Sequence, residues 1–128
     1  MDPISNMIVQ MKNAGLVGHE SVLVPHSKVK ASIAELLKRE SYIRDVKAVT
    51  KKNRQYLDIS LILNKRIPKI RGTKRISKPS KRIYRKHSEI RPVRNGYGLL
   101  VMSTPRGVMS GVDAKRARLG GEALFSIW

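Results

Sequence analysis

The 128-residue sequence contains no cysteine and few aromatic side chains, and its nine acids are far outnumbered by 27 lysines and arginines. The absence of cysteine excludes a disulfide framework and a thiolate metal site, and it is consistent with a cytosolic location. Aromatic residues make up 5% of the chain, too few to build a wide platform on which single-stranded bases stack. The three histidines (His19, His26 and His87) are scattered and lack the spacing of metal ligands.

Long apolar runs and enzyme motifs are missing too. No stretch of the sequence approaches the roughly eighteen apolar residues of a membrane helix, and its start, with Asp2 and Pro3, does not resemble a signal or transit peptide. There is no nucleophile elbow, phosphate loop, zinc-protease motif or dinucleotide fingerprint. Asp113 and Glu122 are the only acids after residue 94. We therefore expect a protein with no catalytic residues, no metal and no cofactor.

Positive charge is concentrated in one segment. Residues 65–94 hold thirteen lysines and arginines against one acid, Glu89, whereas the formal net charge is +4 over residues 1–64 and +2 over residues 95–128. Such segregation favours binding to a polyanion, because each phosphate that is neutralised releases condensed counterions. A disordered basic arm or a solvated face is the alternative. Apolar residues spaced through the segment favour a folded structure; they are Ile67, Ile70, Ile76, Ile83, Tyr84, Ile90 and Val93.

The first half of the sequence begins with the pattern helix, strand, helix. The first helix starts at Asp2 and Pro3 and closes at residues 13–15, and a short strand over residues 22–24 stops at the following proline. Ser27 is a good N-cap for the second helix. Apolar residues mark one face of each helix; they are Ile4, Met7, Ile8 and Met11 in the first and Val29, Ile33, Leu36 and Leu37 in the second.

Two strands follow, at about residues 42–49 and 55–63, and a polar turn at residues 51–54 suits a hairpin between them. Apolar residues alternate in the second strand and predict one buried face; they are Leu57, Ile59, Leu61 and Leu63. The resulting αβαββ unit ends near Asn64, and residues 66–68 form a connection.

Beyond this connection, helical periodicity is lost. Short β-like pieces are separated by glycines and prolines at Gly72, Pro79, Pro92 and Gly96. Residues 99–102 predict a buried strand that leads into a loop of hydroxyl and turn-forming residues at 103–107. Ser110 is a candidate N-cap of a short helix that the pair Gly120-Gly121 ends, and residues 123–128 predict a last strand.

The 103–107 loop has residue types that let a nucleic-acid backbone or base edge come close. Ser103 and Thr104 supply donors and acceptors, Arg106 adds a charge, and Gly107 removes a side chain that would block approach. An ordinary polar turn is the alternative. Glu122 is unusual beside a polyanion that repels it. It accepts hydrogen bonds from base amino groups or ribose hydroxyls, or orients an arginine, or is a plain surface acid after two helix-ending glycines.

Two further basic clusters lie in the first half. The start of the second helix offers free backbone N–H groups together with Lys28 and Lys30, which suits a phosphate group; a capped and solvated first turn is the commoner case. The turn between the two strands holds Lys52 and Arg54, which either touch a second nucleic-acid backbone or serve solubility alone.

Several segments match the motifs of one known family in order along the chain. They are Asp2-Pro3-Ile4, Ser27-Lys28-Val29-Lys30, Arg75-Ile76-Ser77-Lys78-Pro79, Arg82-Ile83-Tyr84, Asn95-Gly96-Tyr97-Gly98, Ser103-Thr104-Pro105-Arg106-Gly107-Val108-Met109, Ala114-Lys115, Leu119-Gly120-Gly121-Glu122 and Trp128. The chain resembles bacterial-type small-subunit ribosomal protein eight, a primary binder of ribosomal RNA. The resemblance covers nearly the whole chain and is most specific near the C-terminus.

The resemblance implies an α+β protein of two domains. The first, at residues 1–64, is the αβαββ helix-on-sheet unit, and the second, at residues 65–128, is mainly antiparallel β with a short helix. The implied function is that of a structural constituent of the small ribosomal subunit, which binds an irregular stem in the central domain of the small-subunit RNA and aids its assembly. The expected partners are this RNA, neighbouring ribosomal proteins and, through translational autorepression, a mimic of the stem in the protein's own operon messenger RNA. The expected location is a ribosome of the cytoplasm or of a plastid, with no membrane partner.

The resemblance also places the RNA contacts. The main ones are expected at Ser103, Thr104, Arg106, Gly107, Gly121 and Glu122. Backbone and electrostatic contacts are expected from Lys28, Lys30, Lys52, Arg54, Lys78, Arg82, Tyr84, Arg85 and Lys86. Two positions depart from the family pattern, because Pro105 stands where serine is common and Ser80 where glycine follows a Lys-Pro pair. The first departure removes a hydroxyl contact or moves it to Ser103 and Thr104, and the second alters a turn.

Two other classes of protein remain open at this point. A non-specific basic protein that compacts DNA or lies on a membrane surface predicts equal affinity for duplex DNA. A small RNA-modifying enzyme predicts chemical turnover. A reader of structured RNA predicts instead that truncating Arg82 or Arg85 weakens binding to all RNA alike, whereas changing Thr104 or Glu122 removes the preference for the cognate stem.

Overall fold

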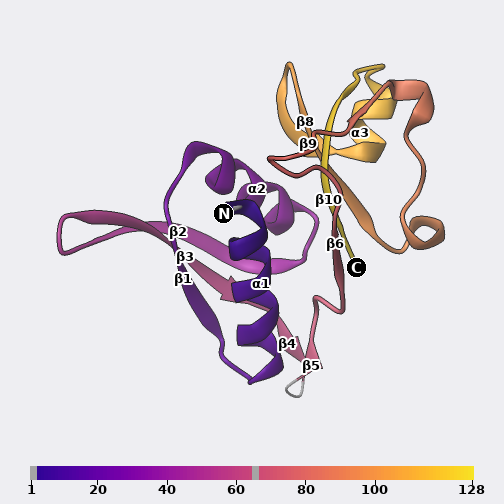
Figure 1. The fold of residues 1–128 in the computed structure, drawn as a ribbon. Coiled ribbons are helices and arrows are strands. Elements are labelled where there is room, and N and C mark those ends of the chain that lie inside the picture. The colour runs from indigo at the N-terminus through magenta and orange to yellow at the C-terminus, as the bar shows by residue number, and fades with distance from the viewer. Residues whose placement is uncertain (1–2, 65–66) are drawn as a thin grey trace. The chain divides into compact units, whose positions relative to one another are not determined.

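The computed structural model of the chain describes residues 3–64 and 67–128. It has an α+β fold whose backbone forms two compact units, Pro3–Arg71 and Gly72–Trp128. The first unit combines two helices with an antiparallel sheet, and the second is rich in antiparallel strands and carries a short helix (Figure 1). The predicted fold class is confirmed. No helix within these described ranges has the length and apolar character needed to cross a bilayer.

The first helix of the first unit, α1 (Pro3–Leu16), is longer than predicted. Its buried face includes Ala14 and Gly15, so the helix passes through residues 13–15, where the sequence predicted its end. The left-handed residue that ends it is Gly18, with a φ of 80°, and the Gly18 N–H donates to the Gly15 carbonyl at 3.1 Å. The predicted cap at Asp2 lies outside the described residues.

The second helix, α2 (Lys28–Arg39), has the predicted cap, because the Ser27 hydroxyl accepts a hydrogen bond from the Lys30 N–H at 3.1 Å. Its buried set, however, is Lys30, Ile33, Ala34, Leu36 and Leu37. Val29, which was predicted to share this face, is 48% exposed. Val29 is the second residue of the helix, and the buried face begins at Lys30 and continues through the later turns.

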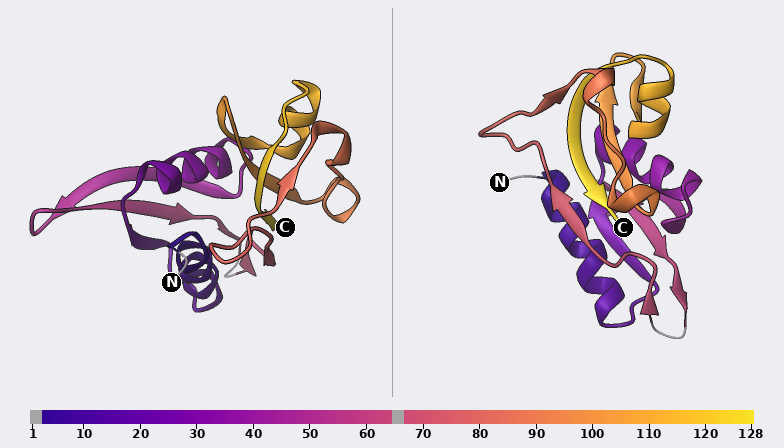
Figure 2. Two further views of the ribbon diagram at one scale, coloured as in Figure 1. Left: turned by 45° about the horizontal axis from the view of Figure 1, so that its top comes forward. Right: turned by 90° about the vertical axis from the view of Figure 1, so that its right-hand side faces the viewer.

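The three-stranded sheet of this unit has the antiparallel order β1-β3-β2, where β1 is Ser21–Pro25, β2 is Ile43–Lys51 and β3 is Arg54–Leu61. Helix α1 packs against β1, and α2 packs against β2. The β2–β3 hairpin extends well beyond both helices (Figures 1 and 2). Its two turn residues, Lys52 and Asn53, have φ values of 50° and 63°, which match the twist of a tight hairpin.

A second, very short hairpin closes the first unit. It pairs β4 (Leu63–Asn64) with β5 (Ile67–Pro68), against which α1 also packs. The predicted division between residues 64 and 65 falls inside this hairpin, whereas the compact units divide between Arg71 and Gly72. That the two units are independent domains stays a prediction.

The sheet of the second unit is organised around β10. Its path is β6 (Thr73–Arg75), β10 (Gly121–Ile127), β8 (Leu99–Thr104) and β9 (Gly107–Ser110), and β7 (Tyr84–Arg85) also pairs with β10. Every pairing is antiparallel. Because β10 receives β6 and β7 on one side and β8 on the other, it holds together three segments that are far apart in the sequence.

Helix α3 (Gly111–Arg116) covers one face of this sheet, where Ala114 packs with Met102 and Ile90 in a buried cluster. The predicted cap is confirmed, because the Ser110 hydroxyl accepts from the Asp113 N–H at 3.1 Å. The predicted end at Gly120-Gly121 is wrong. The chain leaves the helix earlier, through Arg118 at a φ of 56°, and β10 begins at the second of the two glycines.

The basic segment is folded where the structure describes it. It supplies β6 and β7 and a 3-10 turn at His87–Glu89. Ile90 is buried, and Ile76 and Ile83 are half-buried. The apolar residues thus attach the segment to the second unit, while most of its cations stay at the surface.

Candidate nucleic-acid interface

Residues 103–107 form the tip of the β8–β9 hairpin rather than a loop. Ser103 and Thr104 belong to β8, Gly107 begins β9 with a φ of 110°, and only Pro105 and Arg106 make the turn. Thr104 and Gly107 are paired residues. The predicted loop was too long because sequence cannot show that its two ends pair as strands.

The hydroxyl of Thr104 shapes this turn. Thr104 is buried, and its Oγ1 donates to the Gly107 carbonyl at 2.8 Å and accepts from the Arg106 N–H at 3.2 Å. Ser103 differs, because it is half-buried and its hydroxyl makes no hydrogen bond within the part of the chain that the structure describes. Of the two predicted hydroxyl contacts, Ser103 therefore has the free donor, whereas Thr104 fixes the geometry that presents Arg106 at the exposed tip.

Four strands bring a row of side chains onto one face of the sheet. Glu122 on β10 stands opposite Tyr84 on β7 and opposite Ser103 on β8, which in turn stands opposite Val108 on β9. Directly opposed residues of antiparallel strands point to the same face. The next residues along these strands point to the other face, which α3 covers; they are Ala123, Met102 and Met109. The row of Tyr84, Glu122 and Ser103 is thus on the face away from α3.

Glu122 is held in this row by two donors. Its Oε2 accepts a hydrogen bond from the Ser77 hydroxyl and another from Nη1 of Arg82, the latter at 3.1 Å. The Glu122 side chain is 16% exposed and that of Arg82 is 48% exposed. Both bonds go to one carboxylate oxygen. Within the described residues Oε1 accepts no hydrogen bond, and it remains available to a donor from outside.

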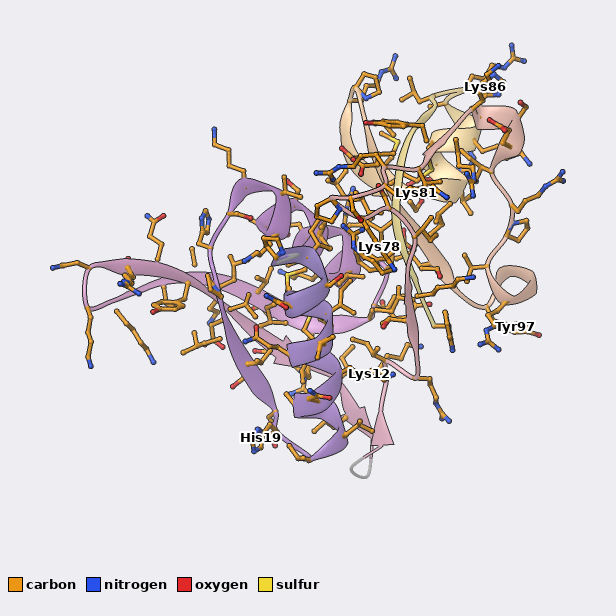
Figure 3. All side chains as sticks on the ribbon, viewed as in Figure 1. Lys12, His19, Lys78, Lys81, Lys86 and Tyr97 are labelled. Carbon is orange, nitrogen blue, oxygen red and sulfur yellow. The ribbon has the colours of Figure 1, made fainter. Side chains whose placement is uncertain are left out.

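Ser77 connects Glu122 to the backbone of the basic segment. It is fully buried, and its Oγ also accepts from the Ile83 N–H at 3.1 Å. Between these residues the chain makes a bend, closed by two hydrogen bonds of 3.0 Å between the backbones of Lys78 and Lys81. The bend projects from the edge of the sheet on the side away from α3 (Figure 2, right), and Lys78 and Lys81 lie near one another on it (Figure 3).

Two glycines let the strands around Glu122 come together. A Cβ on Gly121 would overlap the carbonyl oxygen of Ser103, and one on Gly120 would lie 2.9 Å from the Arg85 carbonyl oxygen. Real Cβ atoms do not come this close to another atom at either position. The predicted site residue Gly121 is therefore required by the packing of β10 between β7 and β8.

The remaining predicted residues fall into two groups. In the second unit the exposed ones are Lys78, Arg82, Tyr84, Arg85 and Lys86. Four residues belong to the first unit. Lys28 is exposed at the start of α2, and Lys52 and Arg54 are exposed at the tip of the β2–β3 hairpin. Lys30 is the exception, because it is buried and its Nζ donates to the Pro25 carbonyl at 3.1 Å. No group of three or more candidate metal ligands occurs among the residues that the structure describes.

Comparison with known proteins gives the family. The model of the family described as ribosomal protein S8 matches residues 2–128. The chain belongs to the ribosomal protein S8 family. Proteins described as small ribosomal subunit protein uS8 are 44% identical in Roseiflexus castenholzii and in Chloroflexus aggregans and 45% identical in Bacillus cytotoxicus. Each alignment covers 99% of this chain and 97% of the relative.

For this member of the ribosomal protein S8 family, sequence reasoning missed Ser77. The residue was recognised only as part of a matching segment, and no role was assigned to it. Its partners are Ile83, six residues on, and Glu122, which is 45 residues on. A small polar residue among cations and isoleucines was the one available signal, and it does not identify a partner so distant in sequence.

Proposed function

We propose that the second unit of this chain recognises an irregular stem in the central domain of the small-subunit ribosomal RNA and thereby aids assembly of the subunit. Membership of the ribosomal protein S8 family makes the chain a structural protein of the small ribosomal subunit and not an enzyme. Its partners are ribosomal RNA and ribosomal proteins, and its place is the ribosome in the cytoplasm.

The observation that carries the proposal is the row of Tyr84, Glu122 and Ser103 on the face away from α3. It combines an exposed ring, a carboxylate with one free oxygen and a hydroxyl with no protein partner among the described residues. Regular RNA duplexes hide their base edges in a deep, narrow groove, so proteins read the shallow minor groove, 2′-hydroxyls and distorted stems. A flat row of short polar groups fits that surface better than a projecting helix does.

The acid in this row has a defined task. A carboxylate near phosphates is repelled, but Oε2 of Glu122 is bonded to Ser77 and to Arg82, whose positive charge offsets the repulsion. Oε1 then accepts from a base amino group or a ribose 2′-hydroxyl. Because such donors occur only at particular places on a distorted stem, Glu122 contributes to discrimination rather than to general attraction.

General attraction comes from the exposed cations around the row and on the projecting hairpin. Lys78, Arg82 and Lys86 are exposed cations of the second unit, and Lys52 and Arg54 stand at the tip of the β2–β3 hairpin. Arg85 is exposed as well, but it follows Tyr84 in β7 and points to the opposite face of the sheet. Contacts of lysine and arginine with phosphate give affinity that depends strongly on salt and hardly on sequence. The hairpin tip is thus a second backbone contact, separate from the row.

The substitution Glu122→Gln tests the role of the row, because it keeps the shape of the side chain and removes its charge. Compared with the natural chain, the variant should lose about 1.5–3 kcal/mol of its preference for the stem over a plain RNA duplex, the range for hydrogen bonds to charged groups. Glu89→Gln is the matched control, since Glu89 is an exposed acid of the same unit that accepts from the Lys86 N–H. Equal effects of the two substitutions on the preference would contradict the proposal.

The same surface offers a route to translational autorepression. A messenger RNA of the protein's own operon that presents the same irregular stem would bind the same row. Competition between the two RNAs for one chain tests this: a messenger mimic should displace the ribosomal stem completely, and Glu122→Gln should weaken both to the same extent.

A further inference from the structure

The second unit has a cavity on the face of its sheet opposite the row of Tyr84, Glu122 and Ser103. A cavity of about 460 Å³ opens between the segment at residues 83–93 and the sheet. Leu100 and Ala123 line it, and they share the α3-covered face with Met102, because cross-strand partners and alternate strand residues point the same way. Glu122 and Ser103 point to the other face. The cavity is therefore distinct from the proposed stem-binding row.

The floor of this cavity is apolar. Apart from the buried Ser126, the side chains that form it are aliphatic; they are Ile76, Ile83, Ile90, Val93, Leu100 and Ala123. Ile90 is buried, and Ile76, Ile83 and Leu100 are half-buried. Part of their apolar surface thus stays open to whatever enters the cavity.

The rim of the cavity is cationic. Lys74, Arg85 and Arg91 line it and are exposed, and none of the three forms an ion pair within the described part of the chain. Arg75 also lines the cavity, but its guanidinium donates to the Leu124 carbonyl. The single acid of the lining is Glu89, whose Oε1 already accepts from the Lys86 N–H at 2.9 Å. The uncompensated charges favour an anion at this place.

An aliphatic floor beneath a cationic rim matches the two halves of a nucleotide. The base and ribose cover the floor, and the phosphate contacts the cations. We infer that the cavity binds an unpaired nucleotide of a second RNA segment, whose phosphate is held by Lys74, Arg85 and Arg91. The inference rests on the proposed function in that the ligand is RNA. It adds a second RNA segment on the other face, so that one unit bridges two parts of the ribosomal RNA.

The test uses the full chain bound to the irregular stem, with isoleucine and leucine methyl groups labelled for NMR. Titration with a short single-stranded RNA should shift the methyl signals of Ile83 and Leu100. The double variant Lys74→Ala/Arg91→Ala should lower affinity for the single strand by about tenfold or more, as for the loss of a charge-assisted hydrogen bond. Its slope of log affinity against log salt should fall by about 0.7 for each phosphate that the variant no longer neutralises.

The control variant is Arg116→Ala, which removes an exposed cation of α3 that does not line this cavity. It should leave the methyl shifts in place. The inference is overturned if the double variant binds the single strand as the natural chain does, or if inorganic phosphate alone shifts the same methyl signals equally. It is also overturned if adenosine monophosphate binds as tightly as the RNA strand, because the site would then serve a free nucleotide.

The same experiment separates this inference from the proposed function. Neither Lys74 nor Arg91 belongs to the stem-binding row, so the double variant should keep the natural preference for the stem over a plain duplex. A natural chain without that preference overturns the proposed function. A natural chain with the preference but without the methyl shifts overturns the second site alone.

Discussion

The two units of the chain stabilise their backbones in different ways. In the first unit, a side-chain cap, helical stripes and a two-residue turn act over a few residues of sequence, and one long-range pairing joins β1 to β3. In the second unit, β10 pairs with β6, β7 and β8, which come from distant parts of the chain. Buried polar and charged side chains divide accordingly among the described residues: Ser77, Thr104, Ser110 and Ser126 lie in the second unit, and Lys30 lies in the first.

Under the proposed function, this difference places irregular backbone beside the proposed stem-binding row. Ser77 holds the basic bend, Thr104 holds the hairpin tip and Ser110 caps the helix behind them. Within the described residues no buried side-chain nitrogen or oxygen lacks a hydrogen-bond partner. Because an unsatisfied buried group is costly, Ser77, Thr104 and Ser110 are each sensitive to substitution, and damage to one should reach the proposed stem-binding row.

Gly121→Ala should have the largest effect. The added Cβ would overlap the Ser103 carbonyl, so the strands must separate, at a cost of about 1–3 kcal/mol typical of overpacking. Thermal and urea unfolding should show lower stability, and preference for the stem should be lost.

Gly18→Ala is the control variant in the first unit, where a φ of 80° makes alanine lower the stability by roughly 1–2 kcal/mol. It should destabilise the protein but spare the preference. Equal loss of preference in both variants would break the distinction between the units.

Ser77→Ala should come next. It removes a donor from Glu122 and leaves the Ile83 N–H without its acceptor, which costs about 1–3 kcal/mol. Urea unfolding measures the loss of stability, and RNA binding should show a reduced preference for the stem. Ser110→Ala is the matched control, because it removes another buried serine of the same unit, the N-cap of α3. Its expected loss of stability is about 1 kcal/mol. If Ser110→Ala reduces the preference as much as Ser77→Ala, the bend has no special role.

The pair Lys52→Asn and Arg54→Ala should change binding without changing stability. Asparagine tolerates the positive φ at position 52, so the hairpin should keep its shape. Affinity for the stem and for a plain duplex should fall together. The salt slope should drop by about 0.9 for each phosphate that the hairpin tip no longer neutralises, on the scale calibrated for DNA. A change in the ratio of the two affinities would mean that the hairpin tip reads structure.

The smallest expected effect concerns the ion pair between Lys38 Nζ and Asp45 Oδ1 in the first unit, at 3.0 Å. The hydrogen bond from Lys38 is the main cause that lowers the pKa of Asp45 below its ordinary value of 3.8. The pair therefore adds stability above pH 3.8, and this contribution is lost as the pH falls through the lower folded-state pKa. Asp45→Asn should be slightly less stable than the natural chain at neutral pH and equal to it in stronger acid. A stability difference that grows on acidification would contradict this assignment.

How much of each unit could be predicted from the sequence depends on whether its structure rests on local or on long-range contacts. Helix α2 and its cap at Ser27 were predicted because the cap and the stripe lie within one short segment. β6 and β7 were not assigned, because strands of two or three residues carry no alternating pattern and exist through pairing with β10. The row of Tyr84, Glu122 and Ser103 was predicted only as separate residues. Their meeting on one face depends on the register of three strands, which sequence alone does not specify.

The most direct test of the central claim is a salt titration of binding to the irregular ribosomal stem, beside a plain RNA duplex of equal length. With roughly six to ten phosphate contacts, each affinity should fall by about three to five decades from 50 to 200 mM salt, on the scale calibrated for DNA. The account predicts that a large preference for the stem survives at high salt, because the contacts of Ser103 and Glu122 do not depend on released counterions. Two curves that converge as salt rises would contradict it and would reduce the second unit to a folded polycation.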